Sequence, residues 1–278
     1  MTAVTNIVRH FAGAVARRLL PARPWHKDLC DYYGVTPEQA LELGTRANGR
    51  RPNLPGSVTT HAVSGRTFEE IWESRRRTTP EEIHSFYKDM GAWAAFRQVV
   101  FHRGHSYAFL AAGIGSGDRI CEYGAGVAPV CFWLVEHLPR TTLTLTIVDV
   151  SSEHLVFGEW RLRRRIEELK TPATLRVREV LPDQLPLDDE YDVITILDVY
   201  EHLHNPLQVT IHICDHLRSG GTLWENYIRS DTVDGANLPI AQQERPKVFD
   251  YLRRHCKLIS GADPHGPDVG ATRCWRRL

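Results

Sequence analysis

The sequence predicts an α/β fold in which helices flank a central sheet. A strand-like apolar stretch at 119–123 runs into two turn glycines and then into an apolar run with helical spacing that starts at Pro129. Further strand and helix patterns alternate from Leu143 to the end of the chain. The 278 residues suffice for one large α/β domain with a helical extension.

The glycine turn after the first predicted strand is the stretch around which the other motifs are arranged, although such a turn alone also occurs as an ordinary tight turn. Gly124 and Gly126 carry no Cβ, so the backbone there can turn tightly and approach a ligand. Pro129 suits the first turn of a helix, and a helix N-terminus offers N–H groups to a ligand's polar atoms. Glu122 stands at the carboxyl end of the strand, the edge where open α/β sheets bind ligands.

The elements after this turn follow one another with short connections. Asp149 ends the second strand, 23 positions after Gly126, near the roughly 20 expected of an acid that binds ribose hydroxyls. The predicted elements are strand 143–150, helix 153–169, strand 175–180, loop 181–187, strand 191–198, helix 207–217, a strand opening at 220, loop 228–243, helix 244–255, and strands 257–260 and 272–276.

The first half of the chain predicts helices and one long loop. Residues 1–27 lack Asp and Glu and place apolar residues at helical spacing, which suits a docked helix, a membrane-surface contact through residues 1–20 or a targeting segment. Helices are predicted over 25–43, with a cap at Thr36, over 68–77 and over 79–111, and a loop over 44–65.

Helix 79–111 opens with the start signal Thr79-Pro80-Glu81-Glu82 and is rich in aromatic residues, most of which belong in a core. His102 and His105 are expected at the surface or as helix caps, because they lack partners at metal-site spacing. The arginines at 161–165 are expected on a solvated face, balanced by glutamates of the same helix.

Four motifs in order resemble a class I S-adenosylmethionine-dependent methyltransferase, close to the ubiquinone O-methyltransferase group. They are Glu-Tyr-Gly-Ala-Gly at 122–126, Ile-Val-Asp-Val at 147–150, Tyr-Asp-Val-Ile-Thr-Ile-Leu-Asp-Val-Tyr-Glu-His-Leu at 191–203 and Leu-Arg-Ser-Gly-Gly-Thr-Leu at 217–223. The resemblance covers residues 115–278 and leaves 1–114 as an N-terminal helical extension and lid. It implies a Rossmann-like, seven-stranded mixed sheet whose last two strands form a hairpin.

The resemblance also implies a cofactor, S-adenosylmethionine, which leaves as S-adenosylhomocysteine, and a set of residues that bind it. Asp149 would accept the ribose hydroxyls, as a carboxylate can accept twice. Leu181 holds the position of the usual adenine-binding acid, so Asp183, two residues on, is the candidate for that task. The other expected cofactor-binding residues are Glu122, Tyr123, Gly124 and Gly126 around the amino-acid moiety, Val150 beside Asp149, and Asp198 at the end of the fourth strand.

The Glu201-His202 pair is expected near the transferred methyl group. His202 is a candidate general base with Glu201 beside it, and a structural role for the pair is the alternative. Asp198, Glu201, His202 and His204 also resemble the magnesium site of small-RNA 2′-O-methyltransferases. The matching downstream histidine is missing before Lys247, so no metal is expected.

The function predicted is methylation of a small molecule at oxygen, nitrogen or carbon. The alternatives are a magnesium-dependent RNA 2′-O-methyltransferase-like enzyme, an NAD(P)-dependent oxidoreductase and a non-catalytic cofactor-binding protein. Zero net charge argues against a nucleic-acid partner, and a homodimer is an open alternative. Six scattered cysteines without a CxxC pair suggest reduced thiols in the cytoplasm, and no apolar run reaches the ~20 residues of a membrane span.

Overall fold

The structure is a computed structural model that describes residues 24–45, 75–228, 237–264 and 270–278. The predicted N-terminal helix with its membrane contact lies outside the described residues. So do most of the loop predicted at 44–65 and residues 68–74 of the next predicted helix.

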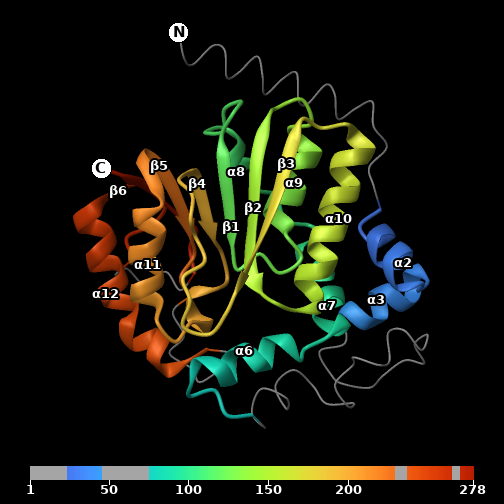
Figure 1. Ribbon diagram of the computed structural model, residues 1–278, viewed down its shortest axis with the longest axis horizontal. Coiled ribbons are helices and arrows are strands. Elements are labelled where there is room, and N and C mark those ends of the chain that lie inside the picture. The colour runs from blue at the N-terminus through green and yellow to red at the C-terminus, as the bar shows by residue number, and fades with distance from the viewer. Residues whose placement is uncertain (1–23, 46–74, 229–236, 265–269) are drawn as a thin grey trace.

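A seven-stranded mixed sheet forms the centre of the described part of the chain, as predicted (Figure 1). The strand order is β3-β2-β1-β4-β5-β7-β6, with β1 to β5 parallel and β7 antiparallel to both its neighbours. This confirms the terminal hairpin inserted into the sheet. The strands are β1 (Arg119–Tyr123), β2 (Leu143–Val150), β3 (Ala173–Val180), β4 (Tyr191–Ile196), β5 (Leu217–Glu225), β6 (Cys256–Ser260) and β7 (Arg273–Arg277).

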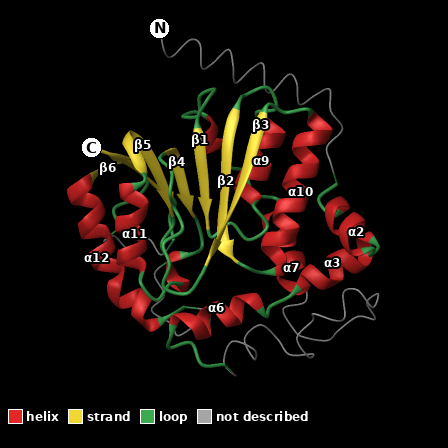
Figure 2. Cartoon of the chain, in the orientation of Figure 1, coloured by secondary structure: helices red, strands yellow, loops and turns green. Residues whose placement is uncertain are grey.

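Helices cover both faces of the sheet (Figure 2), as is usual for parallel strands joined by crossover helices. One face packs on α9 (Pro129–His137) and α10 (Glu153–Leu169) through residues such as Leu145 and Leu134. The other packs on α11 (Pro206–Asp215) and α12 (Pro239–His255), where Ile194 meets Phe249 in one cluster. The short α8 (Ala108–Ala111) joins the first of these clusters through Leu110.

Some predicted boundaries differ from the structure. β3 and β5 each begin earlier than predicted, because parallel pairing with β2 and β4 extends them beyond their apolar stretches. The loop predicted at 228–243 is wrong from Pro239 onward, where α12 begins with a proline in its first turn. Pro246 lies inside this helix, although proline removes one backbone donor there.

The helix predicted over 79–111 is divided into three. Its start is confirmed, because Thr79 and Glu82 form a capping box around Pro80 at the start of α6 (Pro80–Lys88). The continuity was wrong: Gly91 has φ +64°, a left-handed value that ends one helix and precedes α7 (Ala92–His102). Helix 25–43 likewise divides at Gly34 into α2 (Lys27–Tyr33) and α3 (Pro37–Thr45), the latter starting after Thr36 as predicted.

The N-terminal helices pack on the sheet layers rather than standing apart. Phe96 and Val99 of α7 share a buried cluster with α2 and α3 and with Val127 and Phe157 of the sheet-flanking part. α6 shares another with Leu238 and Ala241 of α12. In Figure 1, α6 crosses beneath the ends of the central strands, so it stands where a ligand at that edge would be covered.

Surface and thiol predictions are borne out with one exception. All six cysteines are free, and all but Cys30 are buried. Arg163, Arg164 and Arg165 form ion pairs with nearby acids, whereas Arg161 is buried over the Phe132 ring, 3.8 Å from its centroid. Within the described ranges, no helix has the length and apolar character that crossing a membrane requires.

Candidate functional site

A cavity of about 560 Å³ lies at the carboxyl ends of β1, β2 and β4. Its wall contains every residue predicted for the site except one: Glu122, Tyr123, Gly124, Asp149, Val150, Asp183, Asp198, Glu201 and His202. The exception is Gly126, whose N–H donates to Asp149 at the cavity wall. α6, α7 and the turn between them supply further wall residues, such as Ile83 and Tyr87 of α6 and Met90 of the turn.

Tight packing and unusual backbone angles fix the turn after β1. Gly124 (φ +71°) leaves no room for a side chain, since an added Cβ would lie 2.2 Å from Val199 Cγ2. At Gly126 (φ +51°) a Cβ would lie 2.1 Å from Gln98 Oε1. Gln98, from α7, also accepts from the Val127 N–H at 3.0 Å. The glycines therefore let the turn seat between two side chains from distant elements.

Glu122 serves the helix that follows the turn. Its carboxylate accepts the N–H groups of Val130 (2.9 Å) and Cys131 (2.8 Å), which lie in the first turn of α9. Ala128, the N-cap residue, has no side chain that could do so. Burial raises the pKa of Glu122 to about 7 against the lowering effect of these bonds. The contact of Glu122 with a ligand stays a prediction, since both its oxygens already accept.

Asp149 presents an oriented carboxylate at the end of β2. Oδ2 accepts from Gly126 N at 2.5 Å and Oδ1 from Val150 N at 2.7 Å. Each oxygen keeps a second lone pair for a ligand. The buried His154 lies behind it, with Nε2 3.9 Å from Oδ1, and burial lowers the pKa of this imidazole. The N–H groups of Gly126 and Val150 and the buried His154 ring thus fix the orientation of the Asp149 carboxylate.

The end of β4 brings Asp198 and Glu201 into the cavity wall. Asp198 has φ +56° and is held by a reciprocal pair of hydrogen bonds with the Asn226 amide, each 2.6 Å long. Burial, then the nearby Asp198, raises the pKa of Glu201 to about 8. His202 Nε2 lies 3.8 Å from Glu201 Oε1, and its ring meets that of Tyr87 edge-on at 6.2 Å.

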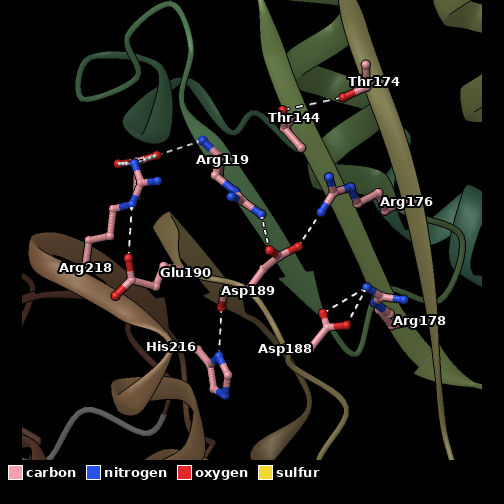
Figure 3. Close-up of polar contacts among 11 residues, drawn as sticks. Arg119, Thr144, Thr174, Arg176, Arg178, Asp188, Asp189, Glu190, His216 and Arg218 are labelled. Atoms are coloured by element: carbon pink, nitrogen blue, oxygen red, sulfur yellow. Dashed lines mark hydrogen bonds and ion pairs between the residues drawn. The ribbon is translucent and has the colours of Figure 1, made fainter.

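Asp183 lies near the surface, in the segment between β3 and β4. Its side chain is 66% exposed, and Oδ1 lies 3.5 Å from His204 Nε2. The far end of this segment is tied to strands of the sheet (Figure 3): Asp189 bridges Arg119 of β1 and Arg176 of β3, while Asp188 binds Arg178.

Three residues that shape the site were not predicted. Gln98 and His154 line the cavity and Asn226 bonds to Asp198 in its wall, but none of the three belongs to a motif. His102 was expected at the surface or as a helix cap; it is half-buried at the end of α7, lines the cavity and bonds through Nδ1 to the Tyr107 hydroxyl at 2.8 Å. Burial lowers the pKa of His102 to about 3, so this histidine is neutral.

The described ranges contain no group of three or more His, Cys, Asp or Glu side chains arranged to hold a metal ion. The four side chains considered at 198–204 are therefore not gathered into a metal site. His204 instead faces Asp183.

Comparisons with known proteins find one family that matches the region around the cavity. Residues 121–223 match a family described as a methyltransferase domain. No curated protein matched the sequence.

Solved structures with similar folds include three enzymes of related description. A methyltransferase from Pyrococcus furiosus is 16% identical, with 61% of this chain and 80% of that chain covered and a TM-score of 0.40. The N-methyltransferase NodS from Bradyrhizobium japonicum WM9, in complex with S-adenosyl-L-homocysteine, is 14% identical over 59% and 79%, with a TM-score of 0.43. An O-methyltransferase family 2 protein from Planctomyces limnophilus, in complex with apigenin, is 13% identical over 66% and 58%, with a TM-score of 0.42.

Proposed function

We propose that this chain, which contains a methyltransferase domain at residues 121–223, is a class I S-adenosylmethionine-dependent methyltransferase that acts on a small molecule. The observation that carries the proposal is the convergence of the glycine turn, Asp149 and the Glu201-His202 pair on one cavity. Its volume of about 560 Å³ falls in the range of roughly 300–1,000 Å³ typical of small-ligand sites. The domain match supports methyl transfer over the oxidoreductase alternative.

The residues of the cavity fit S-adenosylmethionine. The free lone pairs of Asp149 suit two vicinal ribose hydroxyls, and the turn at 124–126 suits the amino-acid moiety. Asp183 at the cavity edge is the candidate for the adenine amine. When bound, the cofactor supplies a methyl group that its sulfonium already activates, so the protein's task is to orient the reactants and exclude water.

The remaining wall would orient the acceptor. Ile83, Tyr87 and Met90 close the cavity from the side of α6, which supports the role of residues 1–114 as an extension and lid. His202 would take a proton from the acceptor, and Glu201, 3.8 Å away, lies beside it. Six free cysteines support a reducing, cytoplasmic compartment. A homodimer stays a prediction.

Calorimetric titration of the purified chain tests the proposal. S-adenosylhomocysteine is expected to bind with a dissociation constant of micromolar order, and NAD⁺ and NADP⁺ to give no binding heat. Absence of S-adenosylhomocysteine binding, or binding of a nicotinamide in its place, would overturn it. Incubation with methyl-labelled S-adenosylmethionine and a library of amines, phenols and carboxylic acids then separates an enzyme from a cofactor-binding protein that yields no labelled product.

The role of His202 is tested separately. His202→Ala is expected to keep S-adenosylhomocysteine affinity but to lower turnover by about 100-fold or more, the usual contribution of a general base. Full turnover in the folded variant would remove His202 from the chemistry.

A further inference from the structure

Two buried carboxyl groups near the end of the sheet differ in how their charge is balanced. Glu225 of β5 is fully buried and has partners on both oxygens: Arg273 Nη1 at 3.3 and 3.4 Å, Trp275 Nε1 at 3.0 Å and the Tyr227 N–H at 2.7 Å. A cation and two further donors make this a satisfied internal ion pair.

Glu201 is buried to nearly the same degree, but its carboxyl group accepts main-chain N–H groups, its own and that of Ile228, and is not paired with an arginine as Glu225 is. It is 2% exposed, and its Oε2 has no hydrogen-bond partner. Within the described part of the chain, His202 Nε2 is the only basic atom within 4 Å of its carboxyl group, at 3.8 Å, which is too long for a hydrogen bond. Buried polar groups are normally satisfied, so an orphaned carboxyl oxygen beside a cavity points to a missing donor.

The surroundings of Glu201 add negative charge and an aromatic face. Burial, and then repulsion from Asp198 and Glu225, raises the pKa of Glu201 to about 8 against the lowering effect of two main-chain hydrogen bonds. Burial also raises the pKa of the Tyr87 phenol, and the charges of Glu201 and Asp149 add to this. A carboxylate and an aromatic ring that line the same cavity form an arrangement that attracts ammonium ions.

We infer that the methyl acceptor is an amine, which docks as an ammonium ion against the carboxyl group of Glu201 with the Tyr87 ring beside it. This rests on the proposed function and narrows the acceptor atom to nitrogen. An alcohol or a carbon acid would donate a hydrogen bond but would bring no charge to balance an ionised Glu201.

The protons and charges of the reaction balance on this assignment. Docking of the ammonium ion ionises Glu201 and releases one proton to solvent. The ammonium ion then passes a proton to His202, which lies beside Glu201 and later gives this proton up to solvent, and becomes a neutral amine. Its lone pair forms the new N–C bond while the S–C bond breaks, so the positive charge passes to the methylated nitrogen and the sulfur leaves as a neutral thioether.

Calorimetry on the S-adenosylhomocysteine-loaded chain tests the inference with matched probes at pH 7. The probes are 2-phenylethylamine and 2-phenylethanol, tryptamine and tryptophol, and cyclohexylamine and cyclohexanol. At least one amine is expected to bind about tenfold or more tightly than its alcohol. The measured heat includes the heat of protonating the buffer, so titrations in phosphate and in Tris, whose ionisation enthalpies differ, report how many protons binding releases. About one proton should be released per amine bound and none per alcohol bound.

Two variants test whether Glu201 causes the amine preference and the proton release. Glu201→Gln should remove both the amine preference and the proton release. Glu190→Gln is the matched control, because this carboxyl group is exposed and lies outside the cavity beside Arg218; it should leave both unchanged. The wild-type comparison stands even if Glu201→Gln fails to fold.

The outcomes separate this inference from the proposed function. Failure of the wild-type chain to bind S-adenosylhomocysteine refutes the proposed function itself. Normal S-adenosylhomocysteine binding with no amine favoured over its alcohol, or an amine preference that persists in Glu201→Gln, overturns the amine assignment alone.

Discussion

Replacement of Asp149 with alanine should separate cofactor binding from folding. Each carboxylate oxygen accepts one main-chain N–H, from Gly126 at 2.5 Å or Val150 at 2.7 Å, and keeps one lone pair for a ligand hydroxyl. A hydrogen bond to a charged group contributes about 1.5–3 kcal/mol, so two give about 3–6 kcal/mol. At about 1.4 kcal/mol per tenfold, S-adenosylhomocysteine affinity should fall between roughly a hundredfold and ten-thousandfold.

The assay is calorimetric titration of Asp149→Ala against the wild type and a control. Asp188→Ala removes an exposed carboxylate that pairs with Arg178 outside the cavity, and its affinity should match the wild type. Adenosine and 2′,3′-dideoxyadenosine supply a sharper comparison: the wild type should favour adenosine, and Asp149→Ala should bind both equally. A folded Asp149→Ala variant with wild-type affinity, or one that still favours adenosine, would refute the assignment of Asp149 to the ribose.

Three further predictions concern stability. Gly124→Ala places a Cβ 2.2 Å from a Val199 side-chain atom at φ +71°, so it should lower the melting temperature. Gly220→Ala is the control, because φ is +78° there but nothing lies within 4 Å of the added Cβ; its melting temperature should fall less. Equal decreases in melting temperature would count against a packing effect. Glu225→Ala strands a buried guanidinium and should cost about 3–5 kcal/mol in urea unfolding; a loss below about 1 kcal/mol would contradict the ion-pair assignment. Burial raises the pKa of Glu122 to about 7 and that of Glu201 to about 8, so between about pH 4.5 and 8 the folded chain binds more protons than the unfolded chain. The free energy of unfolding should therefore fall as the pH rises through this range. Glu201→Gln should reduce this fall in the upper part of the range.

The sheet and its helices were predictable because local signals and burial agree there. β2 and α10 have the predicted bounds, since an apolar run ends at Val150 and Ser152 caps the helix that follows. The breaks at Gly34 and Gly91 were missed, because the periodic apolar pattern continues across them and only the positive φ of each glycine reveals the turn. The start of α12 was missed because Pro239 is equally compatible with a loop.

The site was predictable where its residues belong to motifs and unpredictable where they depend on packing. The turn at 122–126, Asp149 and the Glu201-His202 pair could be found because each lies at or shortly after the carboxyl end of a strand. Gln98 and Asn226 could not, because each meets its partner only after distant elements come together: Gln98 lies 29 positions before Val127, and Asn226 lies 28 after Asp198. Nothing in their own neighbourhoods marks them.

The contact of Gln98 with the loop after β1 has a practical consequence for dissecting the chain. A fragment starting at residue 115 would lose the acceptor of the Val127 N–H and would expose the apolar surface of Val127 and Phe157. The signature loop would then lack the neighbour that shapes it. Experiments that exchange the N-terminal helices between related proteins should therefore keep α7 together with the sheet, because Gln98 of α7 accepts the Val127 N–H of the loop after β1.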